Sequence, residues 1–403
     1  MADGFFVTPP DEATLRFAWQ HRNDDVAQLL LSSHPEVDIR AAARQIEGLQ
    51  TAAAKWPTLL NSSTFCYPPR LNCEQASSEA TANYKAQLCQ RLSGPTAVAA
   101  DLTGGMGIDT MALAAKLRKV HYIERNESLY QLAVNNFSAL KISNIVCHNA
   151  EAENWIATTA EPLEVAYIDP ARRDAHGRKV AAFEQCEPNL VALMPALLAH
   201  ARRVVVKASP MIDIALAISQ IGPIAEIHIM AVGGECKEVL FVSGEAGDIA
   251  MHCVCIAHGR VADFAYSRRE AAEAQATYCQ HAQRYLYVPH AALMKGGCFN
   301  LIGHRYELLK LDRNSHLYTS ERLVADFPGR VFEIETTTPL SRKHIAPLLP
   351  DGRASVLCRN YPAEAADLQR QLRLRDGGSH TLVATTIMGR RLGLLCHSVQ
   401  IDN

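Results

Sequence analysis

A glycine-rich turn joins the apolar segment TAVAA to the helix-like segment MALAAKL, and it reads DLTGGMGIDT at residues 101–110. Because glycine lacks a Cβ, the backbone N–H groups of such a turn can approach a bound cofactor closely. Asp101 ends the preceding strand, where its carboxylate can accept a hydrogen bond from a ligand ammonium group. The third glycine of the dinucleotide-binding pattern would fall at position 110, but Thr110 stands there, which argues against NAD.

The spacing Asp101-x-Thr103-x-Gly105-x-Gly107 resembles the first motif of class I S-adenosylmethionine-dependent methyltransferases. The resemblance implies that these four residues bind the methionine portion of S-adenosylmethionine. The alternative is a tight turn in which the acid caps the following helix, since short motifs recur by chance. The polar residues at the other strand ends therefore decide between the two interpretations.

Two further strand ends carry polar residues that suit an adenosyl group. Glu124 ends the run VHYIERN, where the two oxygens of a carboxylate can accept hydrogen bonds from both ribose hydroxyls. The next strand runs into NAEAENW, and class I methyltransferases often bind adenine there with an Asp or Asn and a neighbouring backbone N–H. Asn149 and Ala150 are therefore the candidate adenine-binding residues. The alternatives are a surface ion pair for the glutamate and an ordinary turn for the asparagine.

The segment VAYIDPARRD supplies the candidate catalytic residues. Asp169 ends a strand, and Pro170 fixes the next φ and removes a donor, so that the acid projects into the cleft. The segment resembles the fourth class I motif in its Asp-Pro-Pro-Tyr form, which amino-methylating nucleic-acid enzymes carry. Ala171 and Arg172 replace the second proline and the aromatic residue, which argues against methylation of an exocyclic amine. We expect Asp169 to hold or deprotonate the acceptor, and Arg172 either to bind an anionic group or to pair with Asp174.

Two further segments flank these motifs. Lys207, in VVVKASPMID, either touches the substrate or neutralises nearby acids, and Arg173 is a second candidate for binding an anion. The segment EQASSEATANYK precedes the first motif at the distance where this class often covers its cofactor. Ser78, Thr81 and Lys85 are therefore further cofactor-binding candidates, with helix capping as the alternative.

These motifs lie in an alternating pattern of strands and helices. The expected strands are 97–102, 119–124, 145–149, 165–169 and 202–208, and the expected helices are 107–118, 127–140, 189–200 and 211–221. The alternation predicts an α/β fold with a doubly wound parallel sheet, in which ligands bind beyond the carboxyl ends of the strands. The runs 225–232 and 236–243 are joined only by GGE, which permits an antiparallel hairpin. This arrangement resembles the Rossmann-like sheet of class I methyltransferases.

The regions on either side of this pattern differ from it. Residues 1–90 show helical spacing and predict a helical N-terminal region, followed by a catalytic domain at 91–250. Residues 251–330 predict a connecting region, and residues 331–403 predict a small α+β module with a hairpin turn near Gly389. A chain of 403 residues suggests two or three domains, and 48% hydrophobic residues is ample to bury their cores.

Seven segments together resemble a bacterial family of class I methyltransferases with a THUMP-like C-terminal domain. They are YPPRLNCEQASSEATANYKA, DLTGGMGIDT, YIDPARRD, KASPMID, GGECKEVL, YLYVPHAALMKGG and RLRDGGSHTLVATTIMGRR. The resemblance runs from about residue 65 to the C-terminus. It implies a ferredoxin-like element around 270–330, a THUMP-like module at 331–403 and, because THUMP-type modules are associated with RNA, an RNA partner by analogy.

Composition sets the remaining expectations. No apolar run approaches the roughly 18 residues of a membrane span, and the N-terminal residues lack a signal-peptide pattern, so we expect a soluble cytoplasmic protein. The twelve cysteines form no C-x-x-C pair, which favours buried thiols over a metal site. Residues 251–403 hold 19 Lys and Arg against 14 Asp and Glu, and residues 1–250 hold 21 against 28. The basic C-terminal part suits either a polyanionic partner or an ordinary solvated surface.

Three functions are consistent with these patterns. The leading hypothesis is an S-adenosylmethionine-dependent methyltransferase that acts on RNA. The second keeps the cofactor and makes a protein or a small molecule the acceptor, and the third is a non-catalytic RNA-binding protein that retains the cofactor fold. If the C-terminal arginines form one face, that face should contact phosphates. They are Arg359, Arg373, Arg375, Arg390 and Arg391.

Overall fold

The structure is a computed structural model that describes residues 9–32, 34–171 and 183–400 of the 403-residue chain. The chain divides into two compact units. The first comprises Met1–Ile227 and Glu238–Gly247, and the second comprises His228–Lys237 and Asp248–Asn403. Within the described residues, no helix is both long and apolar enough to cross a membrane. The domain boundaries expected at residues 90, 250 and 330 stay predictions.

The first unit begins with short helices, which confirms the predicted helical N-terminal region. They are α1 Glu12–Gln20, α2 Val26–Leu31, α3 Ile39–Lys55, the 3₁₀ turn η1 Pro57–Asn61, α4 Arg70–Gln75 and α5 Glu79–Ser93. Asp11, Asp25 and Asp38 precede the first three helices, and each accepts hydrogen bonds from backbone N–H groups of the first turn. Such caps satisfy N–H groups that have no partner within the helix, and they explain where these helices start.

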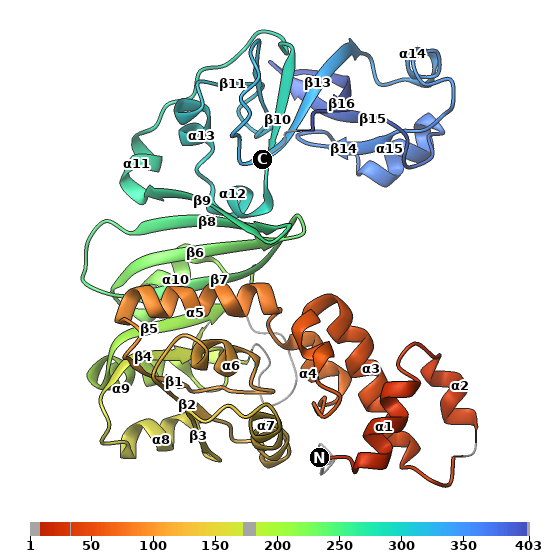
Figure 1. Cartoon of the computed structure of the whole chain (residues 1–403). Helices are drawn as coiled ribbons and strands as arrows, with labels where there is room; N and C mark the ends of the chain where they lie inside the picture. Colours follow the sequence, from red (N-terminus) through yellow and green to blue (C-terminus); the bar gives the residue numbers. More distant parts are fainter. Residues whose placement is uncertain (1–8, 33, 172–182, 401–403) are drawn as a thin grey trace. The chain divides into compact units, whose positions relative to one another are not determined.

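A parallel sheet forms the centre of the first unit (Figure 1). Its strands are β1 Val98–Asp101, β2 Lys119–Ile123, β3 Ile145–His148, β4 Leu163–Ile168 and β5 Ala201–Ala208. Their order is β3-β2-β1-β4-β5, and each neighbouring pair among them is parallel. The strand order reverses between β1 and β4. Ligands of open parallel sheets bind beyond the carboxyl ends of the strands at such a reversal.

Helices connect these strands and confirm the predicted α/β class. They are α6 Ile108–Ala114, α7 Glu127–Ala139, α8 Ala152–Thr158, α9 Leu190–His200 and α10 Ile214–Ile221. Helix α8 was not predicted from the sequence. Its seven residues, AENWIAT, are too few to show a helical period, although Trp155 and Ile156 are buried as on other helices.

An antiparallel hairpin follows the parallel strands, as predicted. β6 Ile224–Val232 and β7 Glu235–Ser243 come next in the sheet, and β7 is antiparallel to β5. Gly233 and Gly234 join the two strands with φ values of +60° and +86°. Left-handed backbone at both central positions is typical of a two-residue hairpin turn, and glycine adopts it without strain.

The second unit holds a further sheet and several short helices. β8 Ala250–Ala257 and β9 Arg260–Ser267 form an antiparallel hairpin. The helices are α11 Arg268–Glu273, α12 Ala291–Gly296, α13 Phe299–Arg305, α14 Arg342–Ile345 and α15 Ala365–Leu372. The other strands are β10 Tyr285–Pro289, β11 Leu309–Lys310, β12 Tyr318–Ser320, β13 Gly329–Thr338, β14 Ser355–Cys358, β15 His380–Ile387 and β16 Arg390–Ser398.

Strands β10 to β16 form one mixed sheet in the order β11-β12-β10-β13-β16-β15-β14. β13 pairs with β10 on one side and with β16 on the other, so the sheet continues across residue 330. Leu286, Phe332 and Leu394 belong to one buried cluster on it. The predicted turn near Gly389 lies between β15 and β16, where Ile387 pairs with Arg390. These elements confirm the predicted α+β character of the C-terminal region.

Candidate active site

The glycine turn after β1 is packed so closely that side chains are excluded at two positions. A Cβ on Gly104 would lie 2.1 Å from the ring of Tyr122 on β2. Gly107 has φ +85°, and a Cβ there would lie 2.6 Å from the ring of Phe137. Tyr122 Oη also donates a hydrogen bond of 2.6 Å to the Gly105 carbonyl oxygen. The turn therefore needs glycine for steric reasons, and its backbone is tightly constrained.

Asp101 ends β1 beneath this turn, and its side chain is buried. Its Oδ2 accepts a hydrogen bond of 2.6 Å from Thr110 Oγ1, and its Oδ1 accepts one of 3.3 Å from the Thr103 backbone N–H. Burial, reinforced by the nearby Asp109 carboxylate, raises the pKa of Asp101 to about 7. The sequence analysis considered Thr110 only because it replaces the third glycine of the dinucleotide-binding pattern. In the structure, its hydroxyl group orients the carboxyl group of Asp101.

The first motif meets the candidate catalytic acid at the ends of β1 and β4. Thr103 Oγ1 accepts a hydrogen bond of 2.7 Å from the Asp169 backbone N–H. The two strands are parallel neighbours, with Asp101 paired to Tyr167. Residues 66 positions apart in the chain therefore lie at one edge of the sheet, as the sequence pattern predicted.

Glu124, at the end of β2, lies against the glycine turn. Its Oε2 accepts a hydrogen bond of 2.9 Å from the Gly105 N–H, and its Oε1 accepts one of 2.7 Å from the Asn126 N–H. Burial raises the pKa of the Glu124 carboxyl group, and these two hydrogen bonds oppose the rise. Asn149 Nδ2 and the Ala150 N–H both donate to the Glu124 carbonyl oxygen, at 2.8 and 3.3 Å. The residues expected to bind the adenosyl group are therefore neighbours.

Asp169 forms an ion pair with Lys207, which follows from the parallel pairing of β4 and β5. Lys207 Nζ lies 2.5 Å from Asp169 Oδ2, and the two side chains are 10% and 36% exposed. Burial alone would lower the pKa of Lys207, but Asp169, Glu238 and Asp109 raise it above its usual value. Of the two roles open for Lys207 in the sequence, the structure shows the neutralisation of acids. Pro170 is buried beside this pair.

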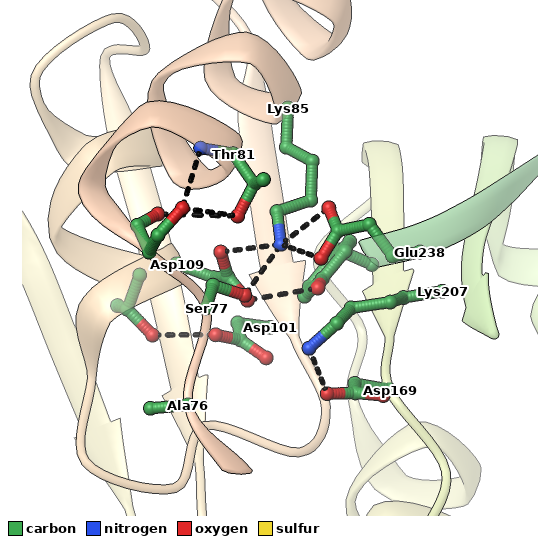
Figure 2. Close-up of polar contacts among 12 residues, drawn as sticks. Ala76, Ser77, Thr81, Lys85, Asp101, Asp109, Asp169, Lys207 and Glu238 are labelled. Carbon is green, nitrogen blue, oxygen red and sulfur yellow. Dashed lines mark hydrogen bonds and ion pairs between the residues drawn. The ribbon is translucent and has the colours of Figure 1, made fainter. Parts of the chain in front are cut away.

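A buried network lies next to the first motif, and the sequence patterns did not predict it. Lys85 Nζ, on α5, lies 2.9 Å from Asp109 Oδ1 and 3.1 Å from Glu238 Oε1 (Figure 2). It also donates a hydrogen bond of 2.5 Å to Ser77 Oγ. Ser77 Oγ and Tyr167 Oη each donate to Asp109 Oδ2 at 2.8 Å. The network thus joins α5, α6, β4 and β7.

Ser78 and Thr81 make the contacts of a helix cap. Ser78 Oγ accepts a hydrogen bond of 3.3 Å from the Thr81 backbone N–H, and Thr81 Oγ1 donates to the Ser78 carbonyl oxygen at 3.2 Å. This is the alternative that the sequence left open for them. Their cofactor contacts, and that of Lys85, stay predictions. Arg172, Arg173 and Asp174 fall outside the described residues.

Glu124 does not form the surface ion pair considered as its alternative role. The two basic residues considered as its partners form ion pairs with other acids. Arg125 pairs with Glu187, and Lys119 Nζ lies 2.6 Å from Glu161 Oε2. Both carboxylate oxygens of Glu124 instead accept backbone hydrogen bonds. Glu124 therefore lines the site, and only 9% of the residue is exposed.

The second unit places the five C-terminal arginines at two ends of its sheet. Cys358 pairs with Ala384 and Thr386 pairs with Arg391, so Arg359, Arg390 and Arg391 belong to the end that carries the hairpin turn. Arg375 forms a bridge with Arg353 before β14 begins, at the opposite end, and Arg373 precedes it by two residues. The arginines therefore fall into two groups at opposite ends of the sheet, and the hypothesis that they share one face stays a prediction.

Two segments of the second unit match known domain families. Residues 285–328 match a ferredoxin-like domain, and residues 329–398 match a domain described as THUMP domain-like. Both matches agree with the modules implied by the sequence resemblance. None of the curated proteins matches the chain.

The chain is similar to a solved structure of a candidate methyltransferase from Porphyromonas gingivalis W83, with 31% identity and a TM-score of 0.85. The alignment covers 96% of this chain and 98% of that protein. An rRNA methylase from Streptococcus thermophilus is 16% identical over 41% of this chain and 95% of its own, with a TM-score of 0.32. A candidate methyltransferase from Streptococcus mutans, solved with SAH, is 15% identical over 31% of this chain and 69% of its own, with a TM-score of 0.26.

Proposed function

Because the chain belongs to the family of class I methyltransferases that carry a THUMP-like C-terminal domain, we propose that it transfers a methyl group from S-adenosylmethionine to RNA. One observation carries the proposal. The glycine turn, Glu124 and the Asp169–Lys207 pair meet at the carboxyl ends of β1, β2, β4 and β5. This is where a doubly wound sheet binds its ligand.

S-adenosylmethionine fits the charge of this cluster. Three acids surround two lysines in the described part of the site, which leaves an excess of negative charge for a ligand with a sulfonium and an ammonium group. The acids are Asp109, Asp169 and Glu238, and the lysines are Lys85 and Lys207. Asp101, whose pKa burial raises to about 7, adds a further negative charge when a ligand ammonium group beside it favours the ionised form. When bound, the sulfonium supplies the activated methyl group.

The shape of the turn also suits this cofactor. Gly105 has φ +54°, and a Cβ on it would have only the Thr103 carbonyl oxygen within 4 Å, at 3.9 Å. The turn is therefore open on one side, where its backbone can approach a ligand. We assign the methionine portion to the first motif, the ribose to Glu124 and the adenine to the turn after β3. The first-motif residues are Asp101, Thr103, Gly105 and Gly107, and the adenine residues are Asn149 and Ala150.

The contacts of Asn149 refine that assignment. Its Nδ2 already donates to the carbonyl oxygens of Glu124 and Arg125, at 2.8 and 3.3 Å. The side-chain oxygen is then the atom available to accept a hydrogen bond from the adenine amino group. The Ala150 N–H shares the Glu124 carbonyl oxygen at 3.3 Å and would have to exchange that long bond for one to the adenine ring.

Asp169 is the residue that we assign to the acceptor. Its carboxylate is partly exposed, while Lys207 is largely buried behind it and holds it in one orientation. A fixed carboxylate can hold an acceptor N–H for in-line attack or take up its proton. Pro170 offers no backbone donor at this position. Arg172 keeps its proposed role in binding an anionic part of the acceptor.

RNA is the acceptor that the THUMP-like domain supports. THUMP-type modules are associated with RNA, and the C-terminal part of the chain carries the excess of basic residues. A protein or small-molecule acceptor would leave this domain without a proposed role. We therefore place substrate binding in the second unit and the chemistry in the first.

The test is methyl transfer with the purified protein, tritiated S-adenosylmethionine and total RNA from a strain that lacks the gene. We expect label in RNA, at a site that mass spectrometry can map. Asp169→Asn should abolish labelling and leave calorimetric binding of S-adenosylhomocysteine unchanged, because we assign Asp169 to the acceptor and not to the cofactor. Label in protein or metabolites but not in RNA would refute the RNA acceptor, and cofactor binding without any transfer would refute the enzyme.

A further inference from the structure

A hollow of about 820 Å³ lies entirely within the second unit. It is lined by four stretches that are far apart in the sequence: residues 271–278, 297–300, 310–316 and the hairpin tip 388–389. Its volume falls in the range of roughly 300–1,000 Å³ that is typical of small-molecule sites. Two segments of the family resemblance reach its lining, at Gly297 and at 388–389, but the sequence analysis assigned no functional role to these residues.

Lys310 is a buried residue in the lining of this hollow. Its residue is only 3% exposed, and its Nζ lies 5.8 Å from the ring centre of Phe299 and 5.9 Å from that of Tyr278. Nζ donates a hydrogen bond of 3.1 Å to the Arg313 carbonyl oxygen and reaches Asn300 Oδ1 at 3.5 Å. Among the residues that the structure describes, no carboxylate forms an ion pair with this ammonium group. Burial lowers the pKa of Lys310, and an anionic ligand would restore it.

His316 adds a polar atom that lacks a partner. Its ring stacks on Phe299 with 3.5 Å between ring centres, and its backbone has φ +51°. Within the described ranges of the chain, its buried Nδ1 has no hydrogen-bond partner. Left-handed backbone is strained for a non-glycine residue, and such strain is often found at ligand sites. Burial, together with Lys310 and Arg359, lowers the pKa of His316 to about 4, so the ring is neutral at pH 7.

The rim of the hollow combines exposed apolar and basic side chains. Tyr278 is 42% exposed and Met388 is 50% exposed, which is high for large apolar side chains. Arg313 is exposed on the same loop as His316. Asp312 fixes this loop to the hairpin, because its oxygens accept hydrogen bonds of 3.2 Å from Asn360 Nδ2 and 3.4 Å from the Gly389 N–H. The ferredoxin-like and THUMP-like segments thus build the hollow together with residues 271–278, which precede both.

We propose that this hollow binds one nucleotide of a single-stranded RNA segment, with the base against Tyr278 and the adjacent phosphate at Lys310 and Arg313. The inference rests on the proposed function only in taking RNA as the partner of the second unit. Asp312 also lines the hollow, and its carboxylate partly offsets the effect of burial on the pKa of Lys310 without forming an ion pair with it. An aromatic ring beside a buried ammonium group that lacks an ion-pair partner among the described residues matches the two parts of a nucleotide, a flat π-face and an anion. The Asn300 side chain, which lines the hollow, can bond to the edge of the base.

A single strand fits this arrangement better than a duplex. Stacking on a protein side chain requires a base that is not already stacked and paired within a helix. The surface that the hollow offers to a base consists of aromatic and amide side chains and not of an extended row of arginines. It therefore favours contacts to one splayed nucleotide over contacts to a long stretch of backbone.

The test uses the full-length protein and a fluorescein-labelled oligoadenylate of twelve nucleotides, followed by fluorescence anisotropy over a series of salt concentrations. Tyr278→Ala should weaken binding about tenfold and leave the salt slope unchanged, because it removes stacking alone. Arg313→Ala should weaken binding and lower the slope of log K against log salt by about 0.7, the value for one phosphate of a single strand. Lys310→Met should resemble Arg313→Ala.

Matched controls separate the hollow from general surface charge. Arg342→Ala and Lys343→Met replace exposed basic residues of α14 that do not line the hollow, and we expect affinity within twofold of the parent. Tyr278→Phe should restore binding, since it keeps the ring. A twelve-base-pair duplex should bind more weakly than the single strand. If Lys310→Met fails to fold, the exposed positions Tyr278 and Arg313 still decide the outcome.

Equal affinity and equal slope for the parent, Tyr278→Ala and Arg313→Ala would overturn the inference, as would equal binding of the duplex. Failure here can be told apart from failure of the proposed function. If the protein methylates RNA and the hollow variants bind the oligonucleotide like the parent, the hollow proposal is wrong and the methyltransferase proposal is supported. If oligonucleotide binding depends on the hollow but no methyl transfer occurs, the hollow proposal is supported and the methyltransferase proposal is wrong.

Discussion

Two carboxyl groups of the site, Asp101 and Asp109, stand eight residues apart and have pKa values shifted in opposite directions. Burial raises the pKa of Asp101 to about 7. Burial would also raise that of Asp109, but Lys85 and Lys207 lower it below its usual value. The difference comes from position: the Asp109 carboxylate touches an ammonium group, and the Asp101 carboxyl group touches only hydroxyl and N–H donors.

This contrast predicts opposite effects of pH on stability at the residue scale. Between about pH 4 and 7, unfolded Asp101 ionises while folded Asp101 stays protonated, so it costs stability increasingly as pH rises and the cost is constant above pH 7. The free energy of unfolding of Asp101→Asn relative to the parent should therefore rise from pH 4 to 7. For Asp109→Asn the difference should fall as pH rises through the acidic range, because the parent gains the ion pair.

The measurement is urea unfolding followed by tryptophan fluorescence. All three tryptophans, Trp19, Trp56 and Trp155, lie in the first unit, so the signal reports on that unit alone. A difference between Asp101→Asn and the parent that is constant from pH 4 to 8 would contradict the assignment of a raised pKa to Asp101. The Asp109 variant serves as the internal control for the sign.

At the scale of elements, Lys85 connects α5 to α6 and β7. Lys85→Met should lower the free energy of unfolding of the first unit by about 3–5 kcal/mol, because it leaves two buried carboxylates without their cation. Adding Glu238→Gln should recover part of the loss, since one unpaired charge is then removed. Tryptophan-monitored unfolding gives both values. If the double variant is no more stable than Lys85→Met, the pairing of α5 with β7 through this charge is wrong.

The register of β14, β15 and β16 makes a second prediction at this scale. Arg390 and Arg391 lie at the hairpin end of the sheet, and Arg373 and Arg375 belong to the other end. Alanine at Arg390 and Arg391 together should lower the salt slope of oligonucleotide binding by about 1.4, for two phosphates. Alanine at Arg373 and Arg375 should leave it unchanged. Equal effects of the two double variants would mean that charge alone matters, wherever it lies on the domain.

For the whole molecule, cofactor binding and RNA binding should be separable. Glu124→Ala should weaken calorimetric binding of S-adenosylhomocysteine about tenfold or more, because it removes charged hydrogen-bond acceptors, and leave oligonucleotide affinity unchanged. Tyr278→Ala should do the reverse. Glu127→Ala, an exposed acid three residues from Glu124, is the control and should change neither. A loss of both activities in either single variant would show that the two sites are energetically coupled.

The sequence alone was enough for the α/β class, for the parallel strands and for the positions of Asp101, Glu124 and Asp169 at strand ends. These features are local, because hydrophobic runs, turn residues and short motifs record them within a few residues. Family resemblance added the ferredoxin-like and THUMP-like domains. Helix α8 was missed because seven residues hold too little periodicity.

Tertiary structure alone decided which side chains touch. Lys85 and Glu238 are 153 residues apart, and no pattern in either segment indicates that α5 and β7 would bring them together. The hollow around Lys310 likewise needs Tyr278, Phe299 and the hairpin tip to converge from separate stretches. A sequence records the tendency of each segment to form an element, whereas contacts between distant segments depend on how all the elements pack at once.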